Sequence, residues 1–200
     1  MIFKQKKIRV IATLLTYISS VLLQSLSSLF EARAAEVNIP HVNIITILVD
    51  DQIYNELKDD IQRYATSYIQ QEIPESKALV MPLNLQNIDA PDIYRMMENI
   101  YFEGLENVNS TLLGLILIGN IPLPVINQDG YVFPSIYPYV DFERQKYVRD
   151  EAEQYFVPNG NLDGQAEIRH GIINYDKDIK AYQEFFKKVK TYKQNPSKFI

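Results

Sequence analysis

An unbroken hydrophobic run, Leu-Leu-Gly-Leu-Ile-Leu-Ile, occupies residues 112–118. A Gly-Asn pair ends this run, and Pro122 and Pro124 prevent regular structure directly after it. A run of this length between turn signals is typical of a strand that is buried on both faces of a parallel sheet. Ligands of open α/β sheets bind beyond the carboxyl ends of such strands. The functional site is therefore expected in the Pro- and Tyr-rich segment that follows, up to residue 139.

Upstream of this run, the hydrophobic pattern predicts two pairs of a strand and a helix. Residues 42–49 are apolar and β-branched, which predicts a strand. Hydrophobic residues three and four positions apart predict an amphipathic helix at residues 52–71. Residues 77–83 predict a second strand, in which Pro82 marks the end or an edge position. A second helix is expected to begin at Asp89, with a proline in its first turn.

Downstream of the run, the pattern is less regular until the last helix. Residues 141–155 are highly charged and are expected to be helical in part, and residues 157–164 predict a turn-rich loop. A weaker strand is expected at residues 166–173, followed by an amphipathic helix at residues 176–192. The alternation of strands and helices predicts an α/β fold, a three-layer α-β-α sandwich around a mostly parallel sheet.

The first 34 residues have the features of an export signal. Basic residues precede a mostly apolar stretch at residues 10–30, and Ala32-Arg33-Ala34 forms a small-residue cleavage site. The apolar stretch is almost long enough to span a bilayer, so an uncleaved membrane anchor is the alternative. Polar residues within the stretch and the well-placed cleavage site favour removal. Both interpretations place the remaining α/β domain, residues 35–200, outside the cytoplasm, either secreted or at the cell surface.

Charge and cysteine content narrow the classes of partner and chemistry. The chain carries 20 basic and 25 acidic residues, and five of the basic but only one of the acidic residues lie in the leader. Residues 35–200 therefore have a net charge of −9, which argues against nucleic acid or an anionic membrane surface as a partner. A membrane contact is expected only through the leader, if it is not cleaved. The chain has no cysteine, which excludes disulfides, thiolate metal sites and a cysteine nucleophile within it.

Several motifs occur in a characteristic order. Residues 115–122, Leu-Ile-Leu-Ile-Gly-Asn-Ile-Pro, are followed by Ser-Ile-Tyr-Pro-Tyr at 135–139, by Glu-Ile-Arg-His-Gly-Ile-Ile at 167–173, and by a Lys-x-x-x-Tyr pattern at 188–192. In this order, and in the long helix after the first strand, residues 43–192 resemble the gingipain-type cysteine peptidases of the caspase-like clan. The resemblance implies a caspase-like or flavodoxin-like sheet, of which this chain holds an incomplete, N-terminal part.

The resemblance also implies what the chain lacks. Members of the family act through a His-Gly pair and a cysteine on two later strand ends, and the histidine takes the proton of the thiol that attacks the peptide carbonyl. Both groups lie beyond the matched region. Ile136 stands where some members carry an acidic residue, so a preference for basic substrate residues is not implied. His170 falls at the family's Gly-Arg position and not at the catalytic His-Gly, so no catalytic residue is predicted in this chain.

Two functions fit these observations. In the first, the chain is the exported N-terminal part of a gingipain-like cysteine peptidase, whose dyad and remaining strands follow Ile200, and residues 112–118 then lie close to an open sheet edge. In the second, the chain is a non-catalytic exported module that binds a peptide or protein through residues 121–139. In both, the residues expected to contact the substrate or ligand are Asn120, Ser135, Tyr137 and Tyr139.

One further pattern concerns metal binding. Asn159, Asn161 and Asp163 occupy alternate positions before a glycine, as in the first half of a calcium-binding loop, and Glu167 falls at its ninth position. The last position lacks the usual bidentate glutamate, and only two of these side chains are charged, which predicts weak binding. A polar turn before a strand is the preferred interpretation. Calcium is the alternative and the only cofactor that the sequence suggests.

Overall fold

The computed structural model describes residues 41–73, 75–104, 109–142, 146–150, 152, 154–159 and 165–194. These residues belong to one compact unit that extends from Pro40 to Ile200. The predicted leader at residues 1–34 lies outside the described residues. Within the described ranges, no helix combines the length and hydrophobicity needed to cross a membrane.

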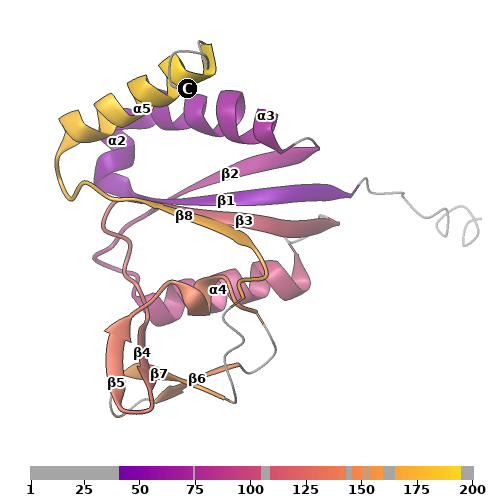
Figure 1. The fold of residues 1–200 in the computed structure, drawn as a ribbon, viewed down its shortest axis with the longest axis vertical. Helices are drawn as coiled ribbons and strands as arrows, with labels where there is room; N and C mark the ends of the chain where they lie inside the picture. Colours follow the sequence, from indigo (N-terminus) through magenta and orange to yellow (C-terminus); the bar gives the residue numbers. More distant parts are fainter. Residues whose placement is uncertain are drawn as a thin grey trace, which may run out of the picture. The chain divides into compact units, whose positions relative to one another are not determined.

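An all-parallel sheet forms the centre of this unit (Figure 1). Its four strands, in spatial order, are β2 (Ser76–Leu83), β1 (Val42–Asp50), β3 (Ser110–Ile118) and β8 (Arg169–Ile173). The prediction of a central buried strand is confirmed, because β3 lies between β1 and β8. Among the described strands, β3 lies one strand in from the edge that β8 forms, and the expectation that it lies close to an open edge stays a prediction. Pro82 lies in β2, at the opposite edge, where one side of the strand needs no hydrogen-bond partner.

Helices cover both faces of the sheet (Figure 1). On one face lie α2 (Asp51–Arg63), the π-helical segment η1 (Tyr64–Ile69), α3 (Gln70–Glu72) and α5 (Ile179–Gln194), and on the other lies α4 (Ala90–Glu103). The predicted helices are therefore present, although the one predicted at residues 52–71 changes from α to π geometry part-way. Ile53 and Ile61 of α2 pack with Tyr182 and Phe186 of α5 against the sheet. The unit thus has the α/β architecture that the hydrophobic pattern predicts.

Side-chain caps determine where two of the helices begin. The Asp50 carboxylate accepts a hydrogen bond from the backbone N–H of Gln52 at 3.0 Å, at the start of α2. At the start of α4, Asp89 accepts from the N–H of Asp92 at 2.9 Å, and Asp92 accepts in return from the N–H of Asp89 at 3.3 Å. Such caps satisfy N–H groups that have no partner within the helix. The predicted start at Asp89 is confirmed.

A second, smaller mixed sheet lies beyond α4 (Figure 1). Its strands, in spatial order, are β5 (Tyr131–Pro134), β4 (Val125–Gln128), β7 (Tyr155–Pro158) and β6 (Tyr147–Asp150). Ile126, Tyr147 and Phe156 form its buried side, packed against Tyr94 of α4 and Tyr137. The rings of Tyr94 and Phe156 meet edge to face, with centroids 5.1 Å apart. This contact attaches the small sheet to the helix layer.

The small sheet corrects two predictions. Residues 141–155, expected to be partly helical, contain β6 and the first residue of β7 in their described part. Residues 157–164, expected to form a loop, begin inside β7, and residues 160–164 lie outside the described residues. In both strands a buried aromatic residue precedes an exposed valine, Val148 or Val157. Such alternation favours a one-sided strand, but over four residues it is too short to recognise among so many charged neighbours.

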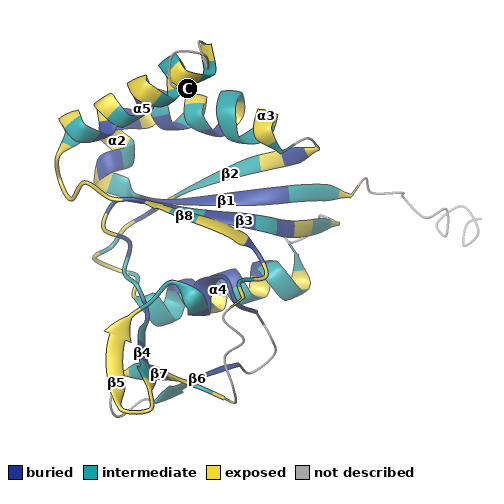
Figure 2. Ribbon diagram, in the orientation of Figure 1, coloured by how far each residue is buried: buried dark blue, intermediate teal, exposed yellow. Residues whose placement is uncertain are grey.

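Burial follows the layers (Figure 2). The interiors of β1 and β3 are buried, as is the sheet-facing side of α4, whereas all four residues of β5 are exposed. Ile47, Leu48, Leu115 and Leu117 are among the residues with no measurable or almost no exposed surface. The hydrophobic core therefore lies around the parallel sheet, and the small sheet presents several apolar side chains outward.

Candidate functional site

The carboxyl ends of β1 and β3 meet where the connections diverge to opposite faces of the sheet. The chain after β1 enters α2 on one face, whereas Ile121, after β3, packs with Ile93 of α4 on the other. Crevices at such points are the usual ligand sites of open α/β sheets. Gly119, directly after β3, donates its N–H to the carbonyl oxygen of Ile173 at 3.0 Å, which ties this exit to the end of β8. Its φ is +94°, and a Cβ here would lie 2.8 Å from the Cβ of Asp50, so the position requires glycine.

Asn120 is held in a polar network at this point. Its side-chain amide donates to an Asp176 carboxylate oxygen at 2.6 Å, and its amide oxygen accepts from the Asn174 side chain at 2.9 Å. The backbone N–H of Asp176 in turn donates to the Asn174 amide oxygen at 2.8 Å. Asn120 thus joins β3 to the turn after β8, and Asn174 and Asp176 are members of the site that the sequence analysis missed. Their only signal was the polar Asn-Tyr-Asp turn before the last helix.

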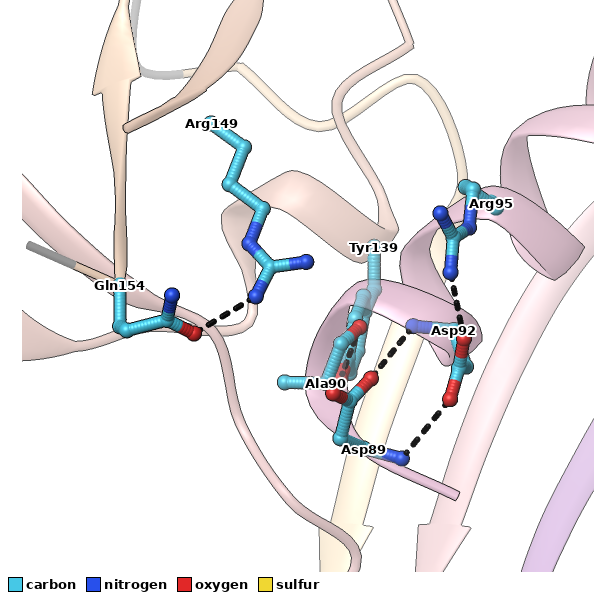
Figure 3. A network of polar contacts seen from close by, with 7 residues as sticks. All are labelled: Asp89, Ala90, Asp92, Arg95, Tyr139, Arg149 and Gln154. Atoms are coloured by element: carbon cyan, nitrogen blue, oxygen red, sulfur yellow. Dashed lines mark hydrogen bonds and ion pairs between the residues drawn. The ribbon is translucent and has the colours of Figure 1, made fainter. Parts of the chain in front are cut away.

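Tyr139, the last residue of the segment 121–139, is buried next to the start of α4 (Figure 3). Its hydroxyl donates to the carbonyl oxygen of Pro122 at 2.7 Å and lies 3.2 Å from that of Ala90. Burial, with a further contribution from the charge of Asp89, raises the pKa of this hydroxyl, so it remains a donor. Tyr139 has no exposed surface and supports the segment through Pro122, and its predicted contact with a ligand stays a prediction.

Ser135 and Tyr137 form hydrogen bonds where the chain leaves the β4–β5 hairpin. The N–H of Ser135 donates to the carbonyl oxygen of Pro124 at 2.8 Å, which closes the base of the β4–β5 hairpin. The Ser135 hydroxyl accepts from the N–H of Tyr137 at 3.2 Å, and Tyr137 packs beside the buried side of the small sheet. Both side chains are half-buried, and their predicted contact with a ligand stays a prediction.

The hairpin itself is the part of the segment that the sequence analysis did not predict. Asp129 and Gly130 form its turn with φ values of +53° and +86°, and the Asn127 side chain accepts from the N–H of Gly130 at 3.0 Å. An Asp-Gly pair between apolar residues is a strong signal for such a turn, and it was available in the sequence. Beyond the turn, Tyr131 is 77% exposed, Val132 is 58% exposed and Phe133 is 40% exposed.

A buried ion pair joins Asp141, which follows the segment 121–139, to Lys146, which precedes β6 of the small sheet. The Lys146 ammonium nitrogen is 2.6 Å from a carboxylate oxygen of Asp141, and both side chains are almost completely buried. The other oxygen of Asp141 accepts from the Tyr147 hydroxyl at 3.0 Å. Burial and the neighbouring Asp141 charge raise the pKa of that hydroxyl, which keeps it protonated. Each charge compensates the other in a region with little access to water.

Glu167 lies beside this pair and makes the stability of the fold depend on pH. Its carboxylate accepts from the N–H of Phe142 at 2.7 Å. Partial burial raises the pKa of Glu167, reinforced by the nearby Asp141 charge and opposed by the Phe142 hydrogen bond.

Because this pKa is higher in the folded than in the unfolded chain, the stabilising contribution of Glu167 is present below the unfolded value and is lost as the pH rises through the raised value. Glu167→Gln removes this loss and keeps an acceptor for Phe142. We expect the melting temperature of the variant to exceed that of the unchanged protein by a margin that grows as the pH rises from about 4 to 7. Two stability curves that stay parallel over this range would contradict the assignment.

Only two of the four candidate calcium ligands, Asn159 and Glu167, lie in the described part of the chain. Asn161 and Asp163 lie outside the described residues. The backbone N–H of Asn159 donates to the carbonyl oxygen of Lys146 at 2.6 Å, and the Glu167 carboxylate is directed at Phe142. Across the described ranges, no group of three or more His, Cys, Asp or Glu side chains is placed to hold a metal ion. The calcium site stays a prediction.

The two histidines of the chain lie at separate places. His41 is exposed before β1, with Nδ1 3.2 Å from the amide oxygen of Asn109. His170 is exposed on β8. Since the 200 residues contain no cysteine, neither histidine has a thiol within this chain to activate.

Comparisons with models of protein families, with curated proteins and with solved structures find no match for this chain. The resemblance to the gingipain-type peptidases therefore rests on the sequence motifs and stays a prediction. The structure itself establishes an α/β unit with helices on both faces of a parallel sheet, joined to a small mixed sheet that includes the hairpin at residues 125–134.

Proposed function

We propose that residues 35–200 form an exported domain of gingipain-type, caspase-like architecture that binds an extended peptide or protein segment through residues 121–139. The observation that carries this proposal is the hairpin in that segment, which exposes the consecutive residues Tyr131, Val132 and Phe133. Exposed aromatic and aliphatic side chains are the groups that bury most area when a partner binds. No catalytic residue is assigned within this chain.

The anchoring of the segment supports this role. Tyr139 holds the start of the segment through Pro122, and Ser135 closes the base of the hairpin on Pro124. A binding loop whose ends are fixed loses less conformational entropy when it takes a ligand. The segment also leaves β3 at the carboxyl end of the sheet, next to the network of Asn120, which is where α/β folds of this strand order bind their ligands.

The second candidate is the N-terminal part of a gingipain-like cysteine peptidase. The hydrophobic strand that ends in Ile-Gly-Asn-Ile-Pro favours it, and the strand order β2-β1-β3-β8 agrees with the start of a flavodoxin-like sheet. The coding sequence after Ile200 distinguishes the two candidates: a His-Gly pair and a cysteine after two further apolar strands would favour the peptidase, and a stop codon would favour the binding module.

The binding role is tested with peptides selected from a phage-displayed random library against the immobilised protein. We expect the double variant Tyr131→Ser/Phe133→Ser to bind the selected, synthesised peptides at least about tenfold more weakly, because aromatic residues dominate such contacts. Fluorescence anisotropy of labelled peptides measures the dissociation constants, and circular dichroism confirms that each variant is folded.

The matched control is Val148→Ser/Val157→Ser, which removes exposed apolar side chains from the same small sheet but outside residues 121–139. This variant should keep the affinity of the unchanged protein within about twofold. Equal losses in both double variants, or a library that yields no peptide whose binding depends on Tyr131 and Phe133, would reject the proposal.

A further inference from the structure

A groove of about 290 Å³ lies between α2, η1 and α5, in the helix layer on the side of the parallel sheet opposite α4 (Figure 1). Its lining consists of Asp60, Arg63, Tyr68, Gln183, Phe186, Lys187 and Lys190. Four of these residues, Arg63, Gln183, Lys187 and Lys190, are exposed. Helices form an outer layer of this architecture, so the opening of the groove does not depend on how many strands the sheet has.

Three cationic side chains meet a single carboxylate in this groove. Arg63 comes from α2, Lys187 and Lys190 come from α5, and Asp60 is the only acidic residue of the lining. The groove therefore has a net charge of +2, although residues 35–200 together carry −9. The overall charge argues against extended anionic surfaces as partners, but it does not describe this one place.

The positive charges are only partly compensated within the chain. Arg63 donates to the Asp60 carboxylate at 3.0 Å, which uses one of the five N–H groups of its guanidinium. Among the described residues, neither Lys187 nor Lys190 takes part in an ion pair. These two lysines lie three positions apart on α5, and like charges at this spacing repel each other and destabilise a helix. An anion bound between them would offset that repulsion.

The bottom of the groove is aromatic and held in place. Phe186 lines it and is only 5% exposed. The ring centroids of Tyr64 and Phe185 lie 5.6 Å and 5.4 Å from that of Phe186, which fixes the ring within the core. Tyr68 adds a second aromatic side chain to the lining. A ligand that fits the groove therefore combines an anionic group with an apolar or aromatic part.

We propose that this groove binds a soluble phosphate monoester whose organic part is apolar or aromatic. A phosphate monoester carries a charge of about −1.5 to −2 at pH 7, which matches the net charge of the groove. Arginine binds phosphate oxygens through paired N–H groups, and lysine binds them as a point charge. The organic part lies against Phe186 and Tyr68. This site is separate from residues 121–139, so its test does not depend on the peptide-binding role.

The first experiment measures binding of phenyl phosphate by isothermal titration calorimetry. The protein is expressed from the whole coding sequence and purified after processing by the host. We expect saturable binding with a dissociation constant of about 1 mM or lower. Phenyl sulfate has nearly the same shape but only one negative charge, so it should bind at least about fivefold more weakly.

The second experiment locates the site with charge variants of α5. Lys187→Gln/Lys190→Gln should weaken the binding of phenyl phosphate at least about tenfold, whereas Lys187→Arg/Lys190→Arg keeps both charges and should stay within about threefold of the unchanged protein. The matched control is Lys180→Gln/Lys188→Gln, which removes the same charge from exposed positions of α5 outside the groove. It should change the affinity by less than about twofold. Circular dichroism confirms that each variant is folded.

Three results would overturn the proposal: no saturable binding of phenyl phosphate, equal losses in the two glutamine variants, or equal affinities for phenyl phosphate and phenyl sulfate. Vesicles of phosphatidylcholine with and without phosphatidic acid test whether the same phosphate group comes from a lipid. Binding to the phosphatidic acid vesicles that depends on Lys187 and Lys190, without binding of phenyl phosphate, would replace the soluble ligand with a lipid headgroup.

Discussion

Replacing Lys146 with methionine should lower the free energy of unfolding by about 3–5 kcal/mol, as measured by urea denaturation. The Asp141 carboxylate is buried, and the Lys146 ammonium group at 2.6 Å is its compensating charge. The Tyr147 hydroxyl, at 3.0 Å from the other carboxylate oxygen, would remain as a neutral donor. A neutral donor offsets only part of the cost of a buried, unpaired charge, and the small sheet that packs on this cluster would lose its support.

Two controls separate the unpaired charge from the loss of a long side chain. The double variant Asp141→Asn/Lys146→Met removes both charges and keeps an acceptor for Tyr147, so it should recover most of the lost stability. Arg63→Met breaks an ion pair with Asp60 that is exposed on α2, and it should cost less than about 1 kcal/mol. If Lys146→Met costs no more than Arg63→Met, the pair contributes nothing as a buried charge cluster.

Gly119→Ala should destabilise the fold by about 2–5 kcal/mol, combining backbone strain with a steric clash. The φ of +94° is one that residues with a side chain rarely adopt. The new methyl group would lie 2.8 Å from the Cβ of Asp50 and 3.1 Å from the Cδ1 of Ile53, both of which are held by the sheet and by α2. Because Gly119 also joins the ends of β3 and β8, the strain falls at the carboxyl edge of the sheet.

Gly171→Ala is the matched control for this substitution. A methyl group there meets no atom within 4 Å, and the backbone does not require glycine. It should therefore change the free energy of unfolding by less than about 0.5 kcal/mol. Equal stability losses for the two alanine variants would mean that the exit from β3 is not constrained as the geometry indicates.

The sequence alone was sufficient for the elements that bury two faces or one long stripe. Strands β1 and β3 are buried on both sides, so their apolar runs are continuous. Helix α4 is predicted by the cap at Asp89 and by the spacing of Ile93, Met97 and Ile100 on one face. Pro82 indicated the end of the second strand or an edge position, and it lies one residue before the end of β2, which is an edge strand among the described residues. These signals are local, because each depends on the period of the residues within one element.

The small sheet could not be recognised in the same way. Each of its strands has four residues, and β6 and β7 each bury one aromatic residue, Tyr147 or Phe156, which is all that distinguishes them from a loop. Which strands pair, and that α4 lies between the two sheets, follows from contacts between residues far apart in the sequence. The Asp-Gly turn of the hairpin was the one local signal that was available and not used.

The same distinction applies to the candidate site. The sequence indicated the place at which the site is proposed, because a Gly-Asn pair after a buried strand and the prolines that follow mark the carboxyl edge of the sheet. Only the tertiary structure decided the roles: it buries Tyr139 as a support, joins Asn120 to Asp176, and leaves Tyr131 and Phe133 exposed. Burial and pairing are decided by what the rest of the chain places around a residue, and no period or spacing along the sequence contains that information.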